Sequence, residues 1–122
     1  MRETDMPYML LVMEPTGQRE ARPLAEGHEV FDRMVRFGES LQAKGILQAS
    51  NSLGGPAKGA RVQVRNGKRS MVDGPFAEAK EIVGGFFLLD CSREQALEAA
   101  AACPAAEFAT IEVREVAPCW EK

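Results

Sequence analysis

Five segments of the chain have hydrophobic patterns typical of β-strands. Tyr8 to Met13 is a short, dense apolar run, as expected of a buried central strand. Gly85 to Asp90 is apolar on both faces and predicts a second central strand. Arg61 to Arg65 and Thr110 to Val116 alternate strictly between polar and apolar residues, which predicts two half-buried strands. Ile46 to Leu53, which precedes two glycines and a proline, is the remaining predicted strand.

The longest helix is predicted over residues 24–44, where apolar residues recur every three or four positions. The positions on or beside this line are Val30, Phe31, Met34, Val35, Phe37 and Leu41. Gly45 is well placed to end the helix. Gly27 and Gly38 weaken it, since glycine in a helix interior costs about 1 kcal/mol relative to alanine, and a start near His28 is the alternative.

Turn-forming residues predict two connections. Residues 14–23 contain two prolines and a glycine and are expected to form a loop. Asn66-Gly67 predicts a tight hairpin turn, because both residues tolerate the positive φ that such turns need. The returning strand of this hairpin is expected over residues 69–72.

A second helix follows the second central strand. Ser92, with Gln95 three residues later, is a capping-box pattern at the start of a helix over residues 93–102, and Pro104 ends it. Without the hairpin, the order of elements is β-α-β-β-α-β. This order predicts a ferredoxin-like α+β fold, in which both helices cover one face of an antiparallel sheet.

The other face of such a sheet lacks a covering layer. One side of the run from Phe86 to Leu89 would lie on that face. An apolar face of this kind is rarely left in water, so a second subunit is expected to cover it. The sequence therefore predicts a homodimer.

Composition narrows the class of protein. A chain of 122 residues with 45% hydrophobic and 27% charged residues is expected to form one domain, spanning residues 1–122. A formal net charge of −3 without a basic run argues against nucleic-acid binding. The longest apolar stretch, Ile82 to Leu89, is too short to cross a membrane, and the charged residues 1–5 are unlike a signal peptide. A cytoplasmic location is therefore expected.

The cysteines indicate neither a metal centre nor a disulfide framework. Cys91, Cys103 and Cys119 are widely spaced, and His28 is the one histidine that could join them. We expect three reduced thiols, with Cys91 and Cys103 packed as small hydrophobic residues. No metal and no cofactor is predicted.

The segment from Asp73 to Glu81 concentrates charge between a strand and a glycine pair. A structural interpretation is that Asp73 caps a short helix that begins at Pro75, with Glu78, Lys80 and Glu81 on its solvated side. The alternative is that these side chains form a binding or catalytic site.

This segment resembles a known family. Asp73-Gly74-Pro75-Phe76 is the tetrapeptide that names the DGPF-domain branch of the YCII-related family, and the flanking residues 61–68 and 84–87 are also similar. The resemblance covers nearly the whole chain. It implies a ferredoxin-like dimeric α/β barrel in which two sheets face each other and enclose a cleft.

The resemblance also implies possible activities. Distant YCII-like relatives include cofactor-free enzymes similar to muconolactone isomerase and a dehydrochlorinase, and some DGPF members occur beside or fused to extracytoplasmic-function sigma factors. In the YCII branch a His–Asp pair is the suspected active site. Here Arg22-Pro23 and His28 resemble that branch's Arg-Pro-x-His with three additional residues, and Cys103-Pro104 stands where the branch has Asp-Pro.

Strand alternation predicts a polar face toward the partner sheet. The valines and isoleucine expected to face the helices are Val62, Val64, Ile111 and Val113. The side chains expected on the opposite face are Arg61, Gln63, Arg65, Glu112 and Arg114. These charges would either pair with one another at the interface or hold an anionic ligand.

Three functions are compatible with these patterns. The first is a cofactor-independent enzyme acting on a small anionic organic substrate, with His28 or Asp73 moving a proton. Its expected substrate-binding residues are Arg65, Phe76, Glu78, Lys80 and Glu81. The second is a non-catalytic ligand-binding or regulatory module, which the resemblance connects with sigma factors. The third is a protein–protein adaptor, which predicts a further exposed apolar patch beyond the dimer face.

Overall fold

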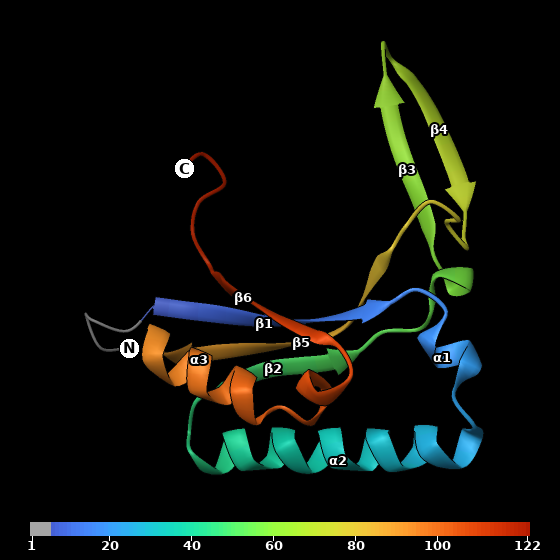
Figure 1. Cartoon of the computed structure of the whole chain (residues 1–122). Coiled ribbons are helices and arrows are strands. Elements are labelled where there is room, and N and C mark those ends of the chain that lie inside the picture. Colours follow the sequence, from blue (N-terminus) through green and yellow to red (C-terminus); the bar gives the residue numbers. More distant parts are fainter. Residues whose placement is uncertain (1–5) are drawn as a thin grey trace.

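A four-stranded antiparallel sheet forms the body of the protein, and a separate two-stranded hairpin rises from one end of it (Figure 1). The computed structural model describes residues 6–122; residues 1–5, which are expected not to form a signal peptide, lie outside the described part. The elements in chain order are β1 (Met6–Pro15), α1 (Gln18–Ala21), α2 (Leu24–Ala43), β2 (Leu47–Ser52), η1 (Pro56–Lys58), β3 (Ala60–Arg65), β4 (Lys68–Asp73), β5 (Glu81–Cys91), α3 (Arg93–Ala102), η2 (Pro104–Glu107) and β6 (Thr110–Glu115).

The order of the strands in the sheet is β2-β5-β1-β6, and each neighbouring pair is antiparallel. β1 and β5 are therefore the two central strands, as their apolar runs predict. Removing the hairpin leaves β1-α2-β2-β5-α3-β6, which is compatible with the predicted ferredoxin-like arrangement. The α+β class is thus confirmed.

The core lies between the sheet and the helices. Alternate residues of β1 and β5 point toward α2 and α3 and are buried; they are Tyr8, Leu10, Val12, Phe87, Leu89 and Cys91. Phe37 of α2 meets Phe87 edge to face, with ring centroids 5.1 Å apart. Cys91 and Cys103 lie in this core, which confirms their predicted packing, and burial raises the pKa of the Cys103 thiol.

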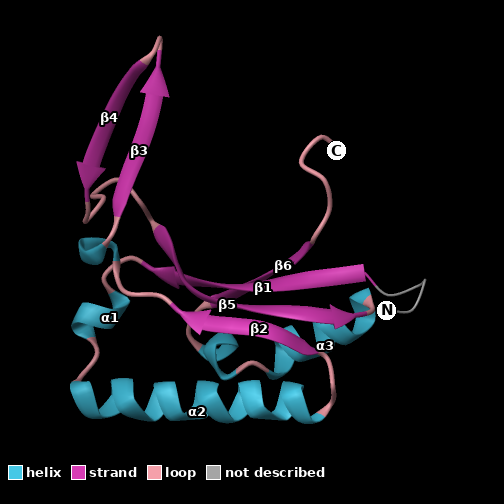
Figure 2. Cartoon of the chain, turned by 180° about the vertical axis from the view of Figure 1, so that it is seen from behind, coloured by secondary structure: helices cyan, strands magenta, loops and turns pink. Residues whose placement is uncertain are grey.

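Both helices lie on one side of the sheet, and the opposite side has no helical layer (Figure 2). The residues that alternate with the buried ones point to this uncovered face. They are partly exposed and mainly apolar: Met9, Leu11, Met13, Phe86 and Leu88. None of the described helices is long and apolar enough to cross a membrane.

Local signals give the helix boundaries closely. α2 begins at Leu24, so the alternative start near His28 is wrong, and it ends with Lys44 as its C-cap before Gly45, whose φ is 75°. The predicted capping box of α3 is present, with the Ser92 side chain accepting from the backbone N–H of Gln95. Residues 14–23 are not the expected loop throughout, because β1 extends to Pro15 and the short helix α1 follows.

The hairpin is the largest departure from the predicted fold. Its turn is the one expected: Asn66 and Gly67 have φ of 53° and 76°. However, β3 and β4 pair only with each other among the described strands, and every residue in both is exposed. The expectation that Val62 and Val64 face the helices is therefore wrong, whereas Ile111 and Val113 of β6 do pack against the core. Alternation predicts one apolar face, but it does not tell whether the same chain covers that face.

Candidate ligand-binding site

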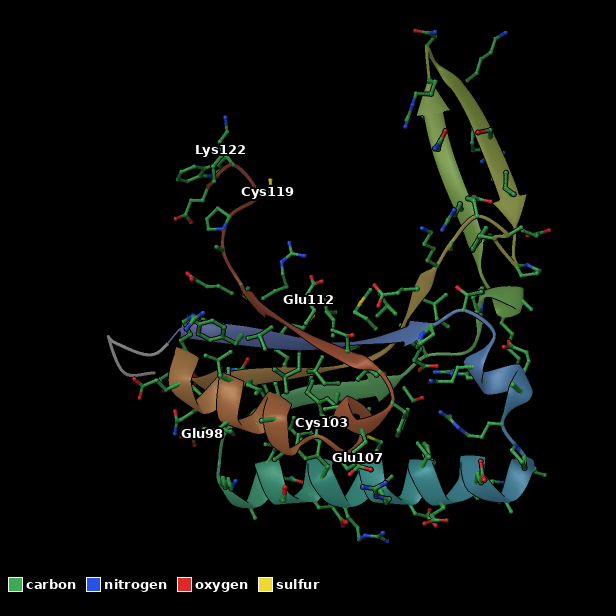
Figure 3. The ribbon with its side chains drawn as sticks, viewed as in Figure 1. Glu98, Cys103, Glu107, Glu112, Cys119 and Lys122 are labelled. Carbon is green, nitrogen blue, oxygen red and sulfur yellow. The ribbon has the colours of Figure 1, made fainter. Side chains whose placement is uncertain are left out.

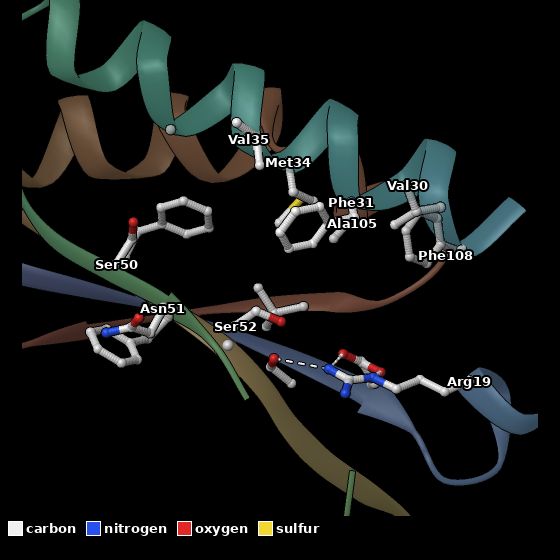
Figure 4. A pocket seen from close by; sticks show the side chains of 18 of the residues that line it. Arg19, Val30, Phe31, Met34, Val35, Ser50, Asn51, Ser52, Ala105 and Phe108 are labelled. Carbon is white, nitrogen blue, oxygen red and sulfur yellow. Dashed lines mark hydrogen bonds and ion pairs between the residues drawn. The ribbon is translucent and has the colours of Figure 1, made fainter. Parts of the chain in front are cut away.

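A cavity of about 780 Å³ lies between α2 and the sheet (Figure 4). Its volume falls within the range of typical small-molecule sites. The apolar side chains of the cavity come mainly from α2 and from the loop after η2; they include Val30, Phe31, Met34, Val35, Phe87 and Phe108. Polar residues of β2 (Ser50, Asn51 and Ser52) border its other side.

α2 packs most closely against the sheet through its C-terminal half, and the cavity borders the helix from Leu24 to Gln42. The buried residues of α2 are Phe37, Gly38 and Leu41, all in its C-terminal half. In the N-terminal half, Leu24 is 76% exposed and Phe31 is 56% exposed. At Gly38 the helix lies close to β5, where an added Cβ would be in ordinary van der Waals contact with the Phe87 ring at 3.6 Å. The N-terminal half therefore leaves open space above the sheet.

A partly buried ion pair lines this cavity. Glu14 of β1, 7% exposed, accepts two hydrogen bonds from Arg19 of α1, from Nε at 2.8 Å and from Nη2 at 2.9 Å. Arg19 also donates to the backbone carbonyls of Leu53 and Gly84, at 2.6 Å and 3.0 Å. One guanidinium thus links α1 with β1, with the end of β2 and with β5. The positive charge of Arg19 balances the negative charge of Glu14.

Arg22 differs from Arg19 because it has no acidic partner. Its guanidinium carbon lies 4.9 Å from the centroid of the Phe108 ring, and its Nη2 donates to Gln18 Oε1 at 3.3 Å. Gln18 is itself fixed by donating to the Phe108 carbonyl at 2.7 Å. No carboxylate of the described residues lies within ion-pair distance of Arg22. The half-buried Arg22 therefore places an unmatched positive charge at the edge of an apolar cavity.

The two predicted proton-transfer residues lie apart from this cavity. His28 is exposed on α2 and does not line the cavity, although its neighbour Gly27 does. Asp73, the last residue of β4, is exposed as well. Neither side chain makes a hydrogen bond within the described part of the chain. Their assignment as catalytic residues stays a prediction.

After Asp73 the chain bends at Gly74 and makes a turn at Ala77 and Glu78, so the predicted short helix that begins at Pro75 is wrong. The Gly74–Pro75 peptide bond is cis, and Ala79 N–H donates to the Phe76 carbonyl at 3.1 Å. The Arg61 guanidinium carbon lies 3.9 Å from the centroid of the Phe76 ring, and Arg61 Nη1 pairs with Glu78 at 3.1 Å.

A second, smaller cavity of about 460 Å³ lies at the base of the hairpin. Phe76 and Glu81 line it together with Lys58 and Arg61, so the structure brings part of the predicted substrate site together.

The other predicted binding residues are further from a cavity. Arg65 lies at the hairpin tip, where its Nη1 donates to the neighbouring Val64 carbonyl at 3.2 Å. Lys80 is exposed, and it is its backbone carbonyl that accepts a hydrogen bond from Thr16 N–H, at 2.9 Å. Neither residue lines either cavity.

Sequence reasoning did not identify Glu14, Arg19 or Arg22 as site residues. Arg19 and Arg22 occur in the segment predicted to be a loop, and an arginine in a loop has no periodic signal. The sequence does show that the apolar stripe on α2 is wide, because Phe31 and Val35 lie beside the main line of core residues. Two apolar residues beyond the core line could have indicated a second apolar surface on that helix.

The fold and the cavity define an α+β domain with a potential ligand site between its longest helix and its sheet. Residues 6–120 match the YCII-related domain, and the chain belongs to this family. A search of curated proteins found no significant match to the chain.

Proposed function

We propose that this protein binds a small organic carboxylate in the cavity between α2 and the sheet, with the carboxylate on Arg22. The observation that supports this proposal is the unmatched charge of Arg22 at the edge of an apolar cavity. A guanidinium and a carboxylate form charge-assisted hydrogen bonds, which are among the stronger ones in proteins. The apolar body of the ligand would lie against Phe31, Met34 and Phe108.

A binding function agrees better with the geometry than acid–base catalysis at His28. A general base must come within hydrogen-bond reach of the proton that it removes. His28 does not line the cavity, and Glu14 is held by two hydrogen bonds from Arg19. Catalysis on an anionic substrate is the second candidate, and the cavity at the base of the hairpin, with Phe76 and Glu81, favours it. If the protein converts a bound carboxylate to a product, and Asp73→Asn abolishes this conversion, the catalytic function is the correct one.

A thermal-shift screen with phenylacetate, cinnamate and hexanoate, each beside its neutral amide, tests the binding proposal. A ligand at about 100 times its Kd adds about 2.7 kcal/mol to the free energy of unfolding. We expect a carboxylate, and not its amide, to raise Tm, and Arg22→Gln to abolish the shift. Arg36→Gln, an exposed change on α2 outside the cavity, is the matched control. Equal shifts with acids and amides, or in Arg22→Gln, would contradict the proposal.

We also propose that the protein is a homodimer of the DGPF branch, in which the uncovered sheet faces of two copies meet. The apolar residues of this face, Leu11 and Leu88 among them, are partly exposed in the single chain. The hairpin and the C-terminal segment both extend to the side of this face, away from the helices (Figure 1). In this position they would contact a second copy seated on the sheet.

Leu88→Glu tests this assembly. A buried unpaired carboxylate is costly, so the variant should be a monomer by light scattering at a concentration at which the wild type is a dimer. Arg36→Glu is the control. It adds a carboxylate on the exposed side of α2 and should leave the dimer intact. A wild-type monomer at all concentrations would refute the proposal.

A further inference from the structure

We propose that the carboxylate ligand is the C-terminus of an extended peptide, which adds to the edge of β2 in the groove between β2 and α2. This inference rests on the binding function proposed above and names its ligand class. Three features support it: the free edge of β2, the length of the groove and the position of Arg22 at one end.

The outer edge of β2 is open. β2 pairs with β5 on one side, and no other strand of residues 6–122 pairs with it. An edge strand presents a row of backbone N–H and C=O groups that can accept a further strand. Peptide addition at such an edge derives its affinity from main-chain hydrogen bonds and its specificity from side-chain pockets.

The groove follows most of the length of α2. The residues of α2 that line it run from Leu24 to Gln42. With a rise of about 1.5 Å per helical residue, these positions span about 27 Å. An extended chain rises about 3.3 Å per residue, so this length corresponds to about eight residues of a peptide. A small carboxylate would occupy only one end.

The wall opposite β2 supplies apolar contacts for alternate side chains. Phe31 and Val35 of α2, which are 56% and 45% exposed, lie one helical turn apart along the groove (Figure 4). Every second side chain of a strand added to β2 points to the same face of the sheet as α2. A peptide with apolar residues at alternate positions would cover both side chains.

The charge at one end gives the direction of the peptide. Arg22 is the C-cap of α1, one residue before the N-cap of α2, and its guanidinium lies over the Phe108 ring. The chain reverses between α2 and β2, so the N-terminal end of α2 lies at the same end of the molecule as the C-terminal end of β2 (Figure 1). The unmatched charge therefore lies at this end of the groove, where Arg19 bonds to the carbonyl of Leu53, the residue after β2. A peptide whose C-terminal carboxylate meets Arg22 runs parallel to β2.

The test is a selection from a pool of random octapeptides with a free C-terminus, using the immobilised full chain and identifying bound peptides by mass spectrometry. We expect enrichment of apolar residues at alternate positions. For the best peptide, the C-terminal amide, N-methylation of alternate backbone amides, and Arg22→Gln should each weaken binding about tenfold or more. Arg36→Gln should bind like the wild type.

Each other outcome overturns the inference. If carboxylates raise Tm through Arg22 but no peptide is enriched, the binding function stands and the peptide proposal is wrong. If neither binds, both are wrong. If N-methylated peptides bind equally well, the β2 edge is not used. If Phe31→Asp dissociates the dimer and Leu88→Glu does not, the groove holds a second copy of this chain.

Discussion

Gly84 lies against the carboxylate of Glu14, and a Cβ at this position would overlap with Glu14 Oε2. The same backbone carbonyl accepts a hydrogen bond from Arg19. This glycine therefore keeps space for the buried ion pair. From the sequence, Gly84-Gly85 is visible as a pair before an apolar run, but its partner Glu14 is distant along the chain. Only the pairing of β1 with β5 brings the two together, so this part of the site could not be predicted.

Gly84→Ala should lower the free energy of unfolding by about 2–3 kcal/mol, because the added methyl group must displace Glu14 or Arg19. Urea unfolding followed by circular dichroism measures this change. Gly27→Ala in α2 is the matched control, since no atom lies within 4 Å of its added Cβ. That change should raise stability by about 0.5–1 kcal/mol. If Gly84→Ala and the wild type have the same free energy of unfolding, the Glu14–Arg19 ion pair can shift to accommodate the added methyl group.

At the scale of elements, α2 shows what local patterns can and cannot predict. Its beginning and end follow from periodicity and from Gly45, which are properties of the adjacent residues. The separation of its N-terminal half from the sheet is not a local property. It depends on where α3, η2 and the sheet lie, and the cavity follows from that packing.

The middle of α2 is fixed to η2 by an ion pair. Arg33 donates to both carboxylate oxygens of Glu107, at 3.2 Å and 2.8 Å, and Figure 3 shows Glu107 directed toward α2. The hydrogen bond and the charge of Arg33 hold the pKa of Glu107 below its usual range. A lowered carboxyl pKa stabilises the fold above its unfolded-state value and loses this effect as pH falls through the folded-state value.

Arg33→Gln should therefore raise the pKa of Glu107 toward the ordinary value of an exposed glutamate. An NMR titration of the Glu107 side-chain carboxyl carbon from pH 7 to pH 2 measures this shift. Arg36→Gln, on the same helix, should leave the titration unchanged. A midpoint for Glu107 that is the same in Arg33→Gln and wild type would mean that the pair does not form in solution.

For the whole molecule, the order of strands and helices was predictable because each central strand has a dense apolar run and each helix has its own end signals. The position of the β3–β4 hairpin was not. Val62, Val64 and Met71 alternate with polar residues as in a strand with one buried face, but all of them are exposed, as are their polar neighbours. A strand pattern predicts an apolar face, but in this hairpin no element of residues 6–122 buries that face.

The proposed dimer gives this hairpin a measurable property. A two-stranded hairpin alone is marginally stable in water, so its amide hydrogens should exchange within seconds when nothing covers it. In the wild-type dimer we expect slow exchange over residues 60–73, and in the Leu88→Glu monomer fast exchange, with β1 protected in both. Hydrogen exchange with mass spectrometry makes the comparison. Fast exchange of the hairpin in the dimer would exclude it from the interface.

The insertion of the hairpin between β2 and β5 also has an entropic consequence. Residues 53–80 form the connection between two neighbouring strands, where a short turn would suffice. The cost of closing a loop rises with the logarithm of its length, so this connection destabilises the β2–β5 pair by roughly 1.7 kcal/mol relative to a four-residue turn. Replacing residues 53–80 with such a turn should stabilise the isolated sheet. The long connection therefore makes the β2–β5 pair less stable than a short turn between the same strands would.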